Sequence, residues 1–389
     1  MTAAASPTPS RRRRWPVVLA TIVVVIAVLV FVASRVDLNY YVLTPGQAQP
    51  VGPLIHVPPS KAHPIHGPVL LTDVYESRVS LLSYLPDRLD ANAHLVPATE
   101  VLGGTTPASE LTTQGYLEMA EAQASAKAAA FRRLGYHVPS HPSGTLVFSV
   151  ASGAPAASAL QVGQIVTGVN GVATPGVCAF ETALRPYGPG DTVRLSVQQS
   201  RVTPRATIVP GRTAVEDVKL GHRPSSLPSG SVSGCPGANP PSRGYLGIEV
   251  ETYVQYSYPF PVSIDTSQIG GPSAGLAMAL TIVDKLSSGH VTGGRTVAAT
   301  GTIDPQGTVG QVGGVPQKTV AVERAAASVL LVPPGQYTTA KAKAGPSLRG
   351  YAVATMDQAL SVLRRLGGQI PPSPGTSTTA PGAAGRASG

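Results

Sequence analysis

The chain has 389 residues, with 42 glycines and 38 prolines, while charged residues make up 13% and aromatic residues 5%. This length exceeds one small domain, and the glycine and proline content predicts β-rich domains joined by linkers. The net charge is +9, but Arg11–Arg14 supply four of those charges, and no basic-aromatic stripe occurs. The diffuse remaining charge argues against a nucleic-acid partner.

An uncharged apolar segment, 15–33, follows the arginines directly. About 20 apolar residues span the hydrocarbon core of a bilayer as a helix, and this segment lacks the polar stripe of a soluble helix. We therefore predict a single-pass transmembrane helix in the cell membrane, with a basic cytoplasmic tail over 1–14 and the later domains extracytoplasmic. A cleaved signal peptide is the alternative, although Phe31 stands where a cut after Ala33 requires a small residue.

The two cysteines, Cys178 and Cys235, belong to no C-x-x-C pair, and the sequence contains no H-E-x-x-H. These patterns predict no zinc or cysteine-based site, and we expect neither a metal nor another cofactor. If most of the chain is exported, its compartment permits a disulfide between the two cysteines. The sequence leaves the disulfide and two free thiols equally open.

In the juxtamembrane region, 34–130, the sequence pattern predicts a few strands and the start of an alanine-rich helix that covers 114–133. Apolar strands alternate with glycine turns over 131–212, where V-A-S-G-A-P-A, I-V-T-G-V-N-G and a closing D-T-V-R-L-S-V follow one another. This order resembles a PDZ domain of the bacterial protease-associated type. The resemblance implies a β-rich, peptide-binding domain.

In the PDZ family, the backbone amides of an apolar-Gly-apolar loop bind the carboxylate of a peptide, and a strand then pairs with that peptide. Leu134, Gly135 and Tyr136 form the candidate loop here. The alternative interpretation of these three residues is the end of the preceding helix, with Gly135 as its capping glycine.

A Pro/Gly/Ser-rich stretch over 213–242 predicts a linker, and the last residues, 369–389, predict a disordered tail. Between them, 243–368 has the pattern of an ordered domain. Its most distinctive segment is Gly270-Gly-Pro-Ser-Ala-Gly275, which precedes an apolar helical stretch. Pro272 suits the first position of a helix, which places Ser273 in the first turn.

A serine at a helix start is a candidate nucleophile. Its backbone N–H has no partner within the helix and lies at the positive end of the helix dipole, where it can stabilise an oxyanion, and Gly270 and Gly271 allow a substrate carbonyl to approach. The hydroxyl needs a base, but no histidine stands in a recognisable triad setting, which argues against a Ser-His-Asp hydrolase. Lys318, placed in the first turn of a second helix by Pro316, is the candidate base, because burial and the dipole lower the pKa of a lysine there.

Gly271-Pro-Ser-Ala-Gly275 and Gly313-Gly-x-x-x-Lys318 together resemble the proteolytic domain of Lon peptidases, over about 244–366. That domain uses a Ser-Lys dyad, which implies Ser273 as nucleophile and Lys318 as base. A threonine in the family steadies the lysine, and Thr300 occupies the matching position. Lon proper often has an acidic residue before Gly-Pro-Ser, whereas this chain has Gly270.

The whole arrangement resembles the membrane-anchored Lon-like PDZ proteases of Gram-positive bacteria, especially actinobacteria. It implies an α+β multidomain chain: a transmembrane helix, a PDZ-like β-rich domain and a Lon-type α/β proteolytic domain. The implied activity is ATP-independent hydrolysis of unfolded or extended protein or peptide substrates, because no G-x-x-x-x-G-K-[ST] motif for ATP occurs. Lon-type domains also commonly form hexamers. The alternative function is a membrane-tethered PDZ scaffold with an idle peptidase domain, and a weaker one is a ring-forming assembly factor.

Overall fold

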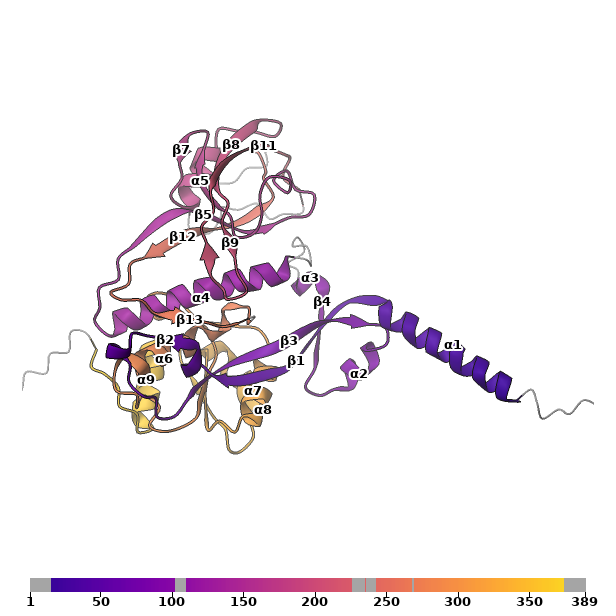
Figure 1. Ribbon diagram of the computed structural model, residues 1–389, viewed down its shortest axis with the longest axis vertical. Helices are drawn as coiled ribbons and strands as arrows, with labels where there is room; N and C mark the ends of the chain where they lie inside the picture. Colours follow the sequence, from indigo (N-terminus) through magenta and orange to yellow (C-terminus); the bar gives the residue numbers. More distant parts are fainter. Residues whose placement is uncertain (1–14, 102–109, 226–234, 236–242, 268, 374–389) are drawn as a thin grey trace, which may run out of the picture. The chain divides into compact units, whose positions relative to one another are not determined.

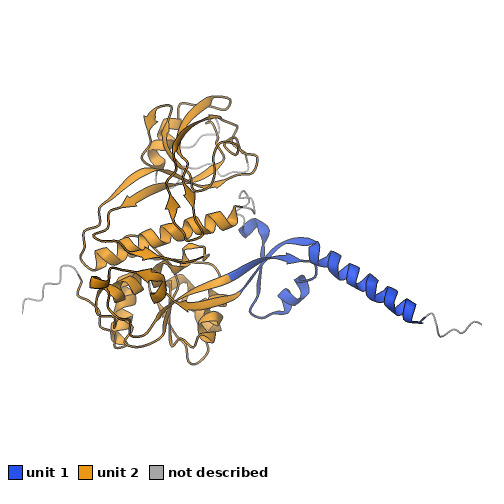
Figure 2. Cartoon of the chain, in the orientation of Figure 1, with its two compact units in different colours: residues 1–44, 75–101 blue, residues 45–74, 102–389 orange. Residues whose placement is uncertain are grey.

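The structure is a computed structural model that describes residues 15–101, 110–225, 235, 243–267 and 269–373. The chain divides into two compact units (Figure 2). Unit 1 comprises Met1–Thr44 and Tyr75–Val101, and unit 2 comprises Pro45–Val74 and Leu102–Gly389. The predicted cytoplasmic tail, 1–14, and most of the predicted disordered tail lie outside the described residues.

Unit 1 begins with α1 (Trp15–Arg35), a helix long and apolar enough to cross a membrane, with a mean hydropathy of 3.2 and no buried residue. It ends two residues beyond the predicted segment. The strands β1 (Asp37–Pro50) and β3 (Val69–Ser80) each have one end in this unit. The other elements of unit 1 are α2 (Tyr84–Leu89), α3 (Ala98–Val101) and β4 (His94–Pro97), which pairs antiparallel with β1.

The larger of two layered regions in unit 2 is built on a parallel sheet. Its strands are β18 (Arg349–Ala352), β17 (Val329–Val332), β14 (Val297–Ala299) and β3, in that order, with β1 beside β3. Both faces of a parallel sheet are normally covered, and the central strands β14 and β17 are accordingly apolar at successive positions. Leu330 and Leu331, for example, are both buried but belong to different cores.

Helices cover the two faces of this sheet (Figure 1). One core includes residues of α4 (Leu111–Arg133), α6 (Gly275–Leu286) and α9 (Met356–Arg365), and the other includes residues of α7 (Val315–Arg324) and α8 (Tyr337–Lys343). The helix α6 is buried on nearly every side, so its apolar sequence is explained by burial rather than by a membrane. The domain expected over 243–368 therefore has the predicted α/β fold.

Short elements complete this region. They are η2 (Gly52–Leu54), η3 (Pro59–Lys61), η4 (Pro272–Ala274), η5 (Pro334–Gln336), and the two-stranded pairs β2 (Ile55–His56) with β13 (Ser263–Ile264) and β15 (Thr302–Ile303) with β16 (Val309–Gly310).

The second region of unit 2 is an antiparallel sheet with its own apolar core, which α5 (Val177–Leu184) joins through Phe180. Its strand order is β11-β8-β6-β5-β12, with β7 beside β6. These strands are β5 (Ser140–Val150), β6 (Ile165–Val169), β7 (Val172–Ala173), β8 (Thr192–Gln198), β11 (Thr213–Lys219) and β12 (Ile248–Tyr256), and a separate hairpin joins β9 (Arg201–Val202) to β10 (Ile208–Val209).

Three predicted domain boundaries differ from these elements. The first residues of the predicted linker, 213–242, form the strand β11, because they pair with β8 over the whole length of that strand. The strand β12 lies in the predicted proteolytic domain but pairs with β5. The helix α4 starts three residues before the predicted 114–133 and shares a core with α6 and α9, so part of the predicted juxtamembrane region packs with the domain expected over 243–368.

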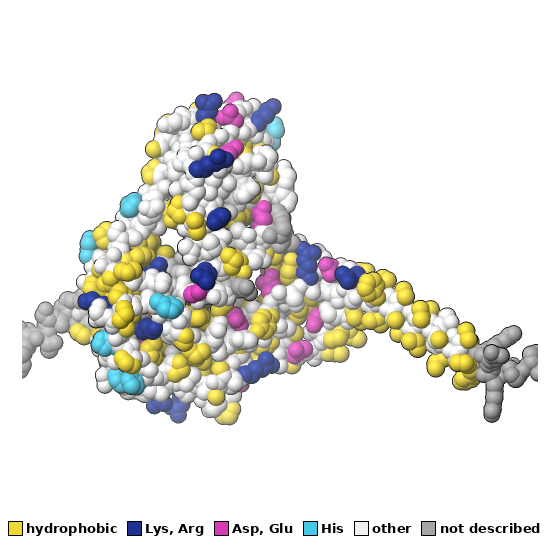
Figure 3. Space-filling view, viewed as in Figure 1, with side chains coloured by type: hydrophobic (Ala, Val, Ile, Leu, Met, Phe, Trp, Pro, Cys, Tyr) yellow, Lys and Arg dark blue, Asp and Glu magenta, His cyan; other side chains and the backbone are white. Residues whose placement is uncertain are grey.

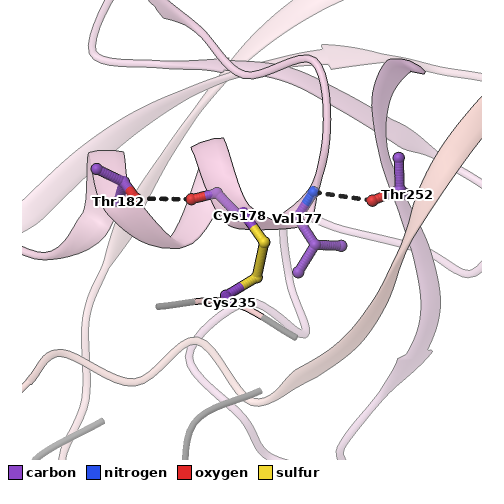
Figure 4. The surroundings of a disulfide bond; sticks show 5 residues. All are labelled: Val177, Cys178, Thr182, Cys235 and Thr252. Atoms are coloured by element: carbon purple, nitrogen blue, oxygen red, sulfur yellow. Dashed lines mark hydrogen bonds between the residues drawn. A yellow bond between two sulfur atoms is a disulfide. The ribbon is translucent and has the colours of Figure 1, made fainter. Parts of the chain in front are cut away.

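The two cysteines form a disulfide, with 5.2 Å between the Cα atoms of Cys178 and Cys235 (Figure 4). Cys178 lies on α5, whose first amide, that of Val177, donates a 3.2 Å hydrogen bond to the Thr252 hydroxyl on β12. The disulfide thereby links Cys235, which lies in the segment expected to be a linker, to the helix α5.

Candidate active site

Ser273 lies in the short helical turn η4, immediately before α6 rather than within it. Gly271 precedes the turn with a φ of +84°, a conformation that favours glycine. At Gly275, a Cβ atom would lie 2.9 Å from the backbone nitrogen of Ile303, so glycine also permits the close approach of β15. The serine side chain is half-buried, as a nucleophile that must meet a substrate requires.

Backbone hydrogen bonds hold this turn against the end of β14. Gly301 donates its N–H to the carbonyl oxygen of Ser273 at 3.0 Å, and Leu276 donates to the carbonyl oxygen of Gly301 at 3.1 Å. Thr300 therefore lies next to a residue that is bonded to the candidate nucleophile.

Thr300 follows β14 directly and is 1% exposed. Its backbone N–H donates to the carbonyl oxygen of Leu331 on β17 at 3.0 Å. Within the described residues, its buried hydroxyl oxygen has no hydrogen-bond partner. A buried hydroxyl without a partner is costly, so this group is available for a polar neighbour.

Lys318 lies in the first turn of α7 and is only 3% exposed. The helix is preceded by Gly314 at a φ of +67°, where a Cβ atom would lie 2.7 Å from the Val74 side chain. Burial lowers the pKa of the Lys318 ammonium from 10.5 to about 8, and the Asp73 carboxylate opposes this shift only in part. Among the described residues, Lys318 forms no ion pair.

The structure therefore holds the turn of Ser273 beside Thr300 and buries Lys318 near the end of β3. Across the part of the chain that the structure describes, no hydrogen bond joins the side chains of these three residues. Catalytic hydrogen bonds are often long in a site without substrate, so this geometry leaves the dyad as a prediction.

The predicted oxyanion loop is held by α4. Gly271 donates its N–H to the carbonyl oxygen of Gly115 at 2.8 Å, and a Cβ atom on Gly270 would lie 3.1 Å from the carbonyl carbon of Gly115. Gly271 is therefore not a free oxyanion donor in this arrangement. The Ser273 N–H takes part in none of the backbone hydrogen bonds outside helices and strands among the described residues.

Sequence reasoning missed two residues at this loop, Gly115 and Glu118. A Glu118 carboxylate oxygen lies 3.9 Å from where a Cβ atom of Gly271 would be. Glu118 therefore brings an acidic group close to the loop, in which Gly270 stands where Lon peptidases often have an acidic residue. No local sequence signal points to either residue, because α4 precedes the loop by the whole PDZ-like region.

The predicted peptide-binding loop at Leu134 is wrong. Gly135 and Tyr136 donate their amides to the carbonyl oxygens of Arg132 and Phe131, at 3.0 and 2.9 Å, in the Schellman arrangement that ends a helix. These amides are already used and cannot bind a carboxylate. The alternative interpretation, a helix cap with Gly135 at a φ of +84°, is confirmed.

A different apolar-Gly-apolar segment, Leu246-Gly247-Ile248, leads into β12 and borders a cavity of about 340 Å³. Gly247 has a φ of +74°, and a Cβ atom there would meet Ala154 at 2.3 Å. The cavity lies between β12, an edge strand, and α5. Its other lining residues include Phe180, Glu181 and Leu184 from α5 and the cations Arg223 and Arg243.

The model of one protein family, the Lon protease (S16) C-terminal proteolytic domain, matches residues 249–358. The segment contains Ser273, Thr300 and Lys318. The chain therefore carries a Lon-type proteolytic domain, and the class that this domain defines is that of serine-type endopeptidases, which are hydrolases.

Among curated proteins, Lon protease 1 of Sorangium cellulosum is 36% identical over 99 residues. The match covers 25% of this chain and 12% of that protein, so the chain spans about an eighth of the relative's length.

Two solved structures are similar to part of this chain: the PDZ domains of the SdrC-like proteins of Listeria monocytogenes and Listeria innocua. They are 21% and 18% identical, and each has a TM-score of 0.20. Each covers 28% of this chain, and the chain covers 87% and 96% of them, respectively.

Proposed function

We propose that this chain is a membrane-anchored serine endopeptidase that hydrolyses peptide bonds without ATP, with Ser273 as nucleophile and Lys318 as general base. The observation that carries the proposal is the burial of Lys318, which lowers its pKa to about 8 within a Lon-type proteolytic domain. A solvated lysine is almost wholly protonated at neutral pH and cannot accept a proton, whereas this one is partly neutral.

In the proposed reaction, the Ser273 hydroxyl attacks the carbonyl carbon of the scissile bond while its proton passes to the neutral Lys318 amine. The Ser273 N–H stabilises the oxyanion that forms. The Lys318 ammonium then gives its proton to the leaving amine as the C–N bond breaks. Water hydrolyses the resulting ester of Ser273 by the same steps, with Lys318 again accepting the proton.

Thr300 is proposed as a positioning residue. Its buried hydroxyl, which has no partner among the described residues, would accept a hydrogen bond from the Lys318 amine and direct that amine toward Ser273. Such a bond would give the buried Thr300 hydroxyl the polar partner that it otherwise lacks among the described residues.

The substrates we propose are unfolded or extended polypeptides, because the sequence carries no P-loop motif for ATP-driven unfolding. The cavity between β12 and α5 would bind their carboxyl ends. Backbone amides of Leu246-Gly247-Ile248 and the nearby Arg243 favour a carboxylate, the edge of β12 can pair with an extended chain, and Phe180 and Leu184 favour an apolar last side chain.

The length and hydropathy of α1 support the proposed anchoring, and the arginines before it favour a cytoplasmic amino terminus. The disulfide between Cys178 and Cys235 suits the oxidising side of the membrane. A hexameric ring, common for Lon-type domains, is the proposed assembly.

The test is casein turnover without ATP by the full chain in lipid vesicles, for the wild type and for Ser273→Ala. The matched control is Ser361→Ala, which removes an exposed hydroxyl on α9. We expect cleavage by the wild type and the control and none by Ser273→Ala. Equal cleavage by Ser273→Ala would exclude Ser273 as the nucleophile.

The second candidate function is a membrane-tethered PDZ scaffold with an idle peptidase domain. Two observations favour it: Ser273 and Lys318 are not hydrogen-bonded to each other in the described structure, and Gly115 occupies the Gly271 amide. Binding of carboxyl-terminal peptides without turnover of any polypeptide would support this scaffold.

A further inference from the structure

Four leucines in the segment 81–89 of unit 1 are exposed: Leu81 by 55%, Leu82 by 46%, Leu85 by 62% and Leu89 by 76%. We call them the leucine foot. Leu81 and Leu82 lie in the turn after β3, and Leu85 and Leu89 lie on the helix α2. Single exposed leucines are ordinary on a protein surface, but four in one short segment form an apolar patch that marks an interaction site.

The leucine foot is fixed at the end of the apolar helix α1. Leu81 donates its backbone N–H to the carbonyl oxygen of Val36 at 2.8 Å, and Leu82 donates to that of Ala33 at 3.2 Å. Carbonyl oxygens in the last turn of a helix have no partner within it. The turn after β3 supplies these partners, so the foot cannot move away from the end of α1 without breaking both bonds.

The length of α1 determines where this end lies in a bilayer. A helix of 21 residues is about 30 Å long, which equals the thickness of the hydrocarbon core. No spare turn is therefore left to lift the foot above the lipid. Figure 3 shows α1 as a band of hydrophobic side chains.

The residues around the foot suit the interfacial layer of a membrane. Arg35 ends α1 and Arg88 lies on α2, both exposed, where they can meet lipid phosphates. The rings of Tyr40 and Tyr84 lie 6.2 Å apart, and tyrosine is typical of this layer. The acidic residue of α2, Asp87, is half-buried, whereas its leucines and its arginine are exposed.

We propose that the leucine foot lies in the outer interfacial layer of the same bilayer that α1 spans. The occupant of this apolar patch is therefore lipid, and the foot is a second, monotopic membrane contact beside the transmembrane helix. The inference rests on the proposed anchoring by α1. A second contact restrains unit 1 against turning about the axis of α1.

The experiment uses tryptophan fluorescence of the full chain in phosphatidylcholine vesicles whose acyl chains are brominated near the glycerol end. Trp15, at the start of α1, is the chain's one tryptophan and reports insertion of α1 in the wild type. The double variant Trp15→Phe/Leu85→Trp reports the foot. Trp15→Phe/Leu89→Trp repeats the test at its most exposed position, and Trp15→Phe/Val172→Trp, at an exposed position on β7, is the control.

We expect strong quenching and a blue-shifted emission for tryptophan at 85 and at 89, and no quenching at 172. Quenching of Trp15 without quenching at 85 and 89 overturns the foot while the anchor stands. A blue shift at 85 and 89 without quenching also overturns it, because protein rather than lipid then covers the patch. If Trp15 is not quenched, the proposed anchoring fails, and the inference fails with it.

Discussion

The backbone N–H of Gly271 donates a 2.8 Å hydrogen bond to the carbonyl oxygen of Gly115, which joins the candidate catalytic loop to the helix α4. The loop and the helix approach so closely that only glycine fits comfortably on the loop side. Ser273 lies two residues after Gly271, so the position of α4 influences the position of the candidate nucleophile.

This contact predicts an asymmetry between two glycine-to-alanine variants. In Gly270→Ala, the new Cβ atom would lie 3.1 Å from the Gly115 carbonyl carbon, so the loop must shift. We expect a loss of about tenfold in kcat, because small displacements of catalytic groups are costly. In Gly115→Ala, the nearest atom of the loop would be 3.6 Å away, an ordinary contact, and activity should be kept. Equal activities of the two variants in casein turnover would contradict this account of the loop.

The pH dependence of turnover should follow the Lys318 amine. Its pKa is lowered by burial to about 8, and only the neutral form accepts a proton. We therefore expect kcat/KM to rise about tenfold per pH unit below pH 8 and then to level off. Because the pKa of Glu121 is raised to about 9, Glu121→Gln is the control and should leave the rising limb unchanged. A profile that is flat from pH 6 to 9 would argue against Lys318 as the base.

The same lowered pKa predicts that Lys318→Met is more stable than the wild type at neutral pH. The folded chain disfavours the ammonium, so between pH 8 and 10.5 the unfolded state binds more protons, and the unfolding free energy of the wild type rises with pH there. Below pH 8 the full penalty applies, and its removal should add on the order of 3 kcal/mol. Denaturant unfolding at pH 7 and above pH 10.5 measures the difference, which should shrink at the higher pH. Lys341→Met, at an exposed lysine on α8, should show no such gain.

The half-buried carboxyl group of Glu121 predicts a second effect of pH on stability. Glu121 on α4 shares a side-chain hydrogen bond with Glu251 on β12, beside a cavity of about 520 Å³. Burial first, and then the Glu251 charge, raise the pKa of Glu121 from 4.5 to about 9. Its contribution to stability is therefore complete below pH 4.5 and is lost as pH rises through about 9.

Glu121→Gln should flatten the fall in Tm over this range, and it should raise the unfolding free energy at pH 9 by on the order of a few kcal/mol. Glu100→Gln, at an exposed position on α3, is the control. A fall in Tm of the same size in Glu121→Gln and in the wild type would show that another group is responsible.

Much of this organisation follows from local sequence patterns. The apolar segment 15–33 is enough to predict α1, and the alanine-rich stretch 114–133 is enough to predict α4, because helices depend on near neighbours. Proline before Ser273 and before Lys318 correctly placed both residues at helical starts. The match over 249–358 agrees with the family that these motifs indicated.

The remainder depends on contacts between distant segments. An apolar-Gly-apolar triplet occurs at Leu134 and again at Leu246, and the sequence alone cannot show that the first ends a helix while the second borders a cavity. The strands β11 and β12 were missed for the same reason, since their partners are distant in the chain. Gly115 lies beside the candidate catalytic loop because α4 and α6 pack in one core.

The central claim is tested most directly by covalent labelling of the full chain with diisopropyl fluorophosphate, followed by mass spectrometry of its peptides. We predict a single phosphoryl adduct on Ser273 in the wild type and no adduct in Lys318→Met, because without the base the hydroxyl is not activated. An adduct on a different serine, or equal labelling of Ser273 without Lys318, would contradict the Ser-Lys mechanism.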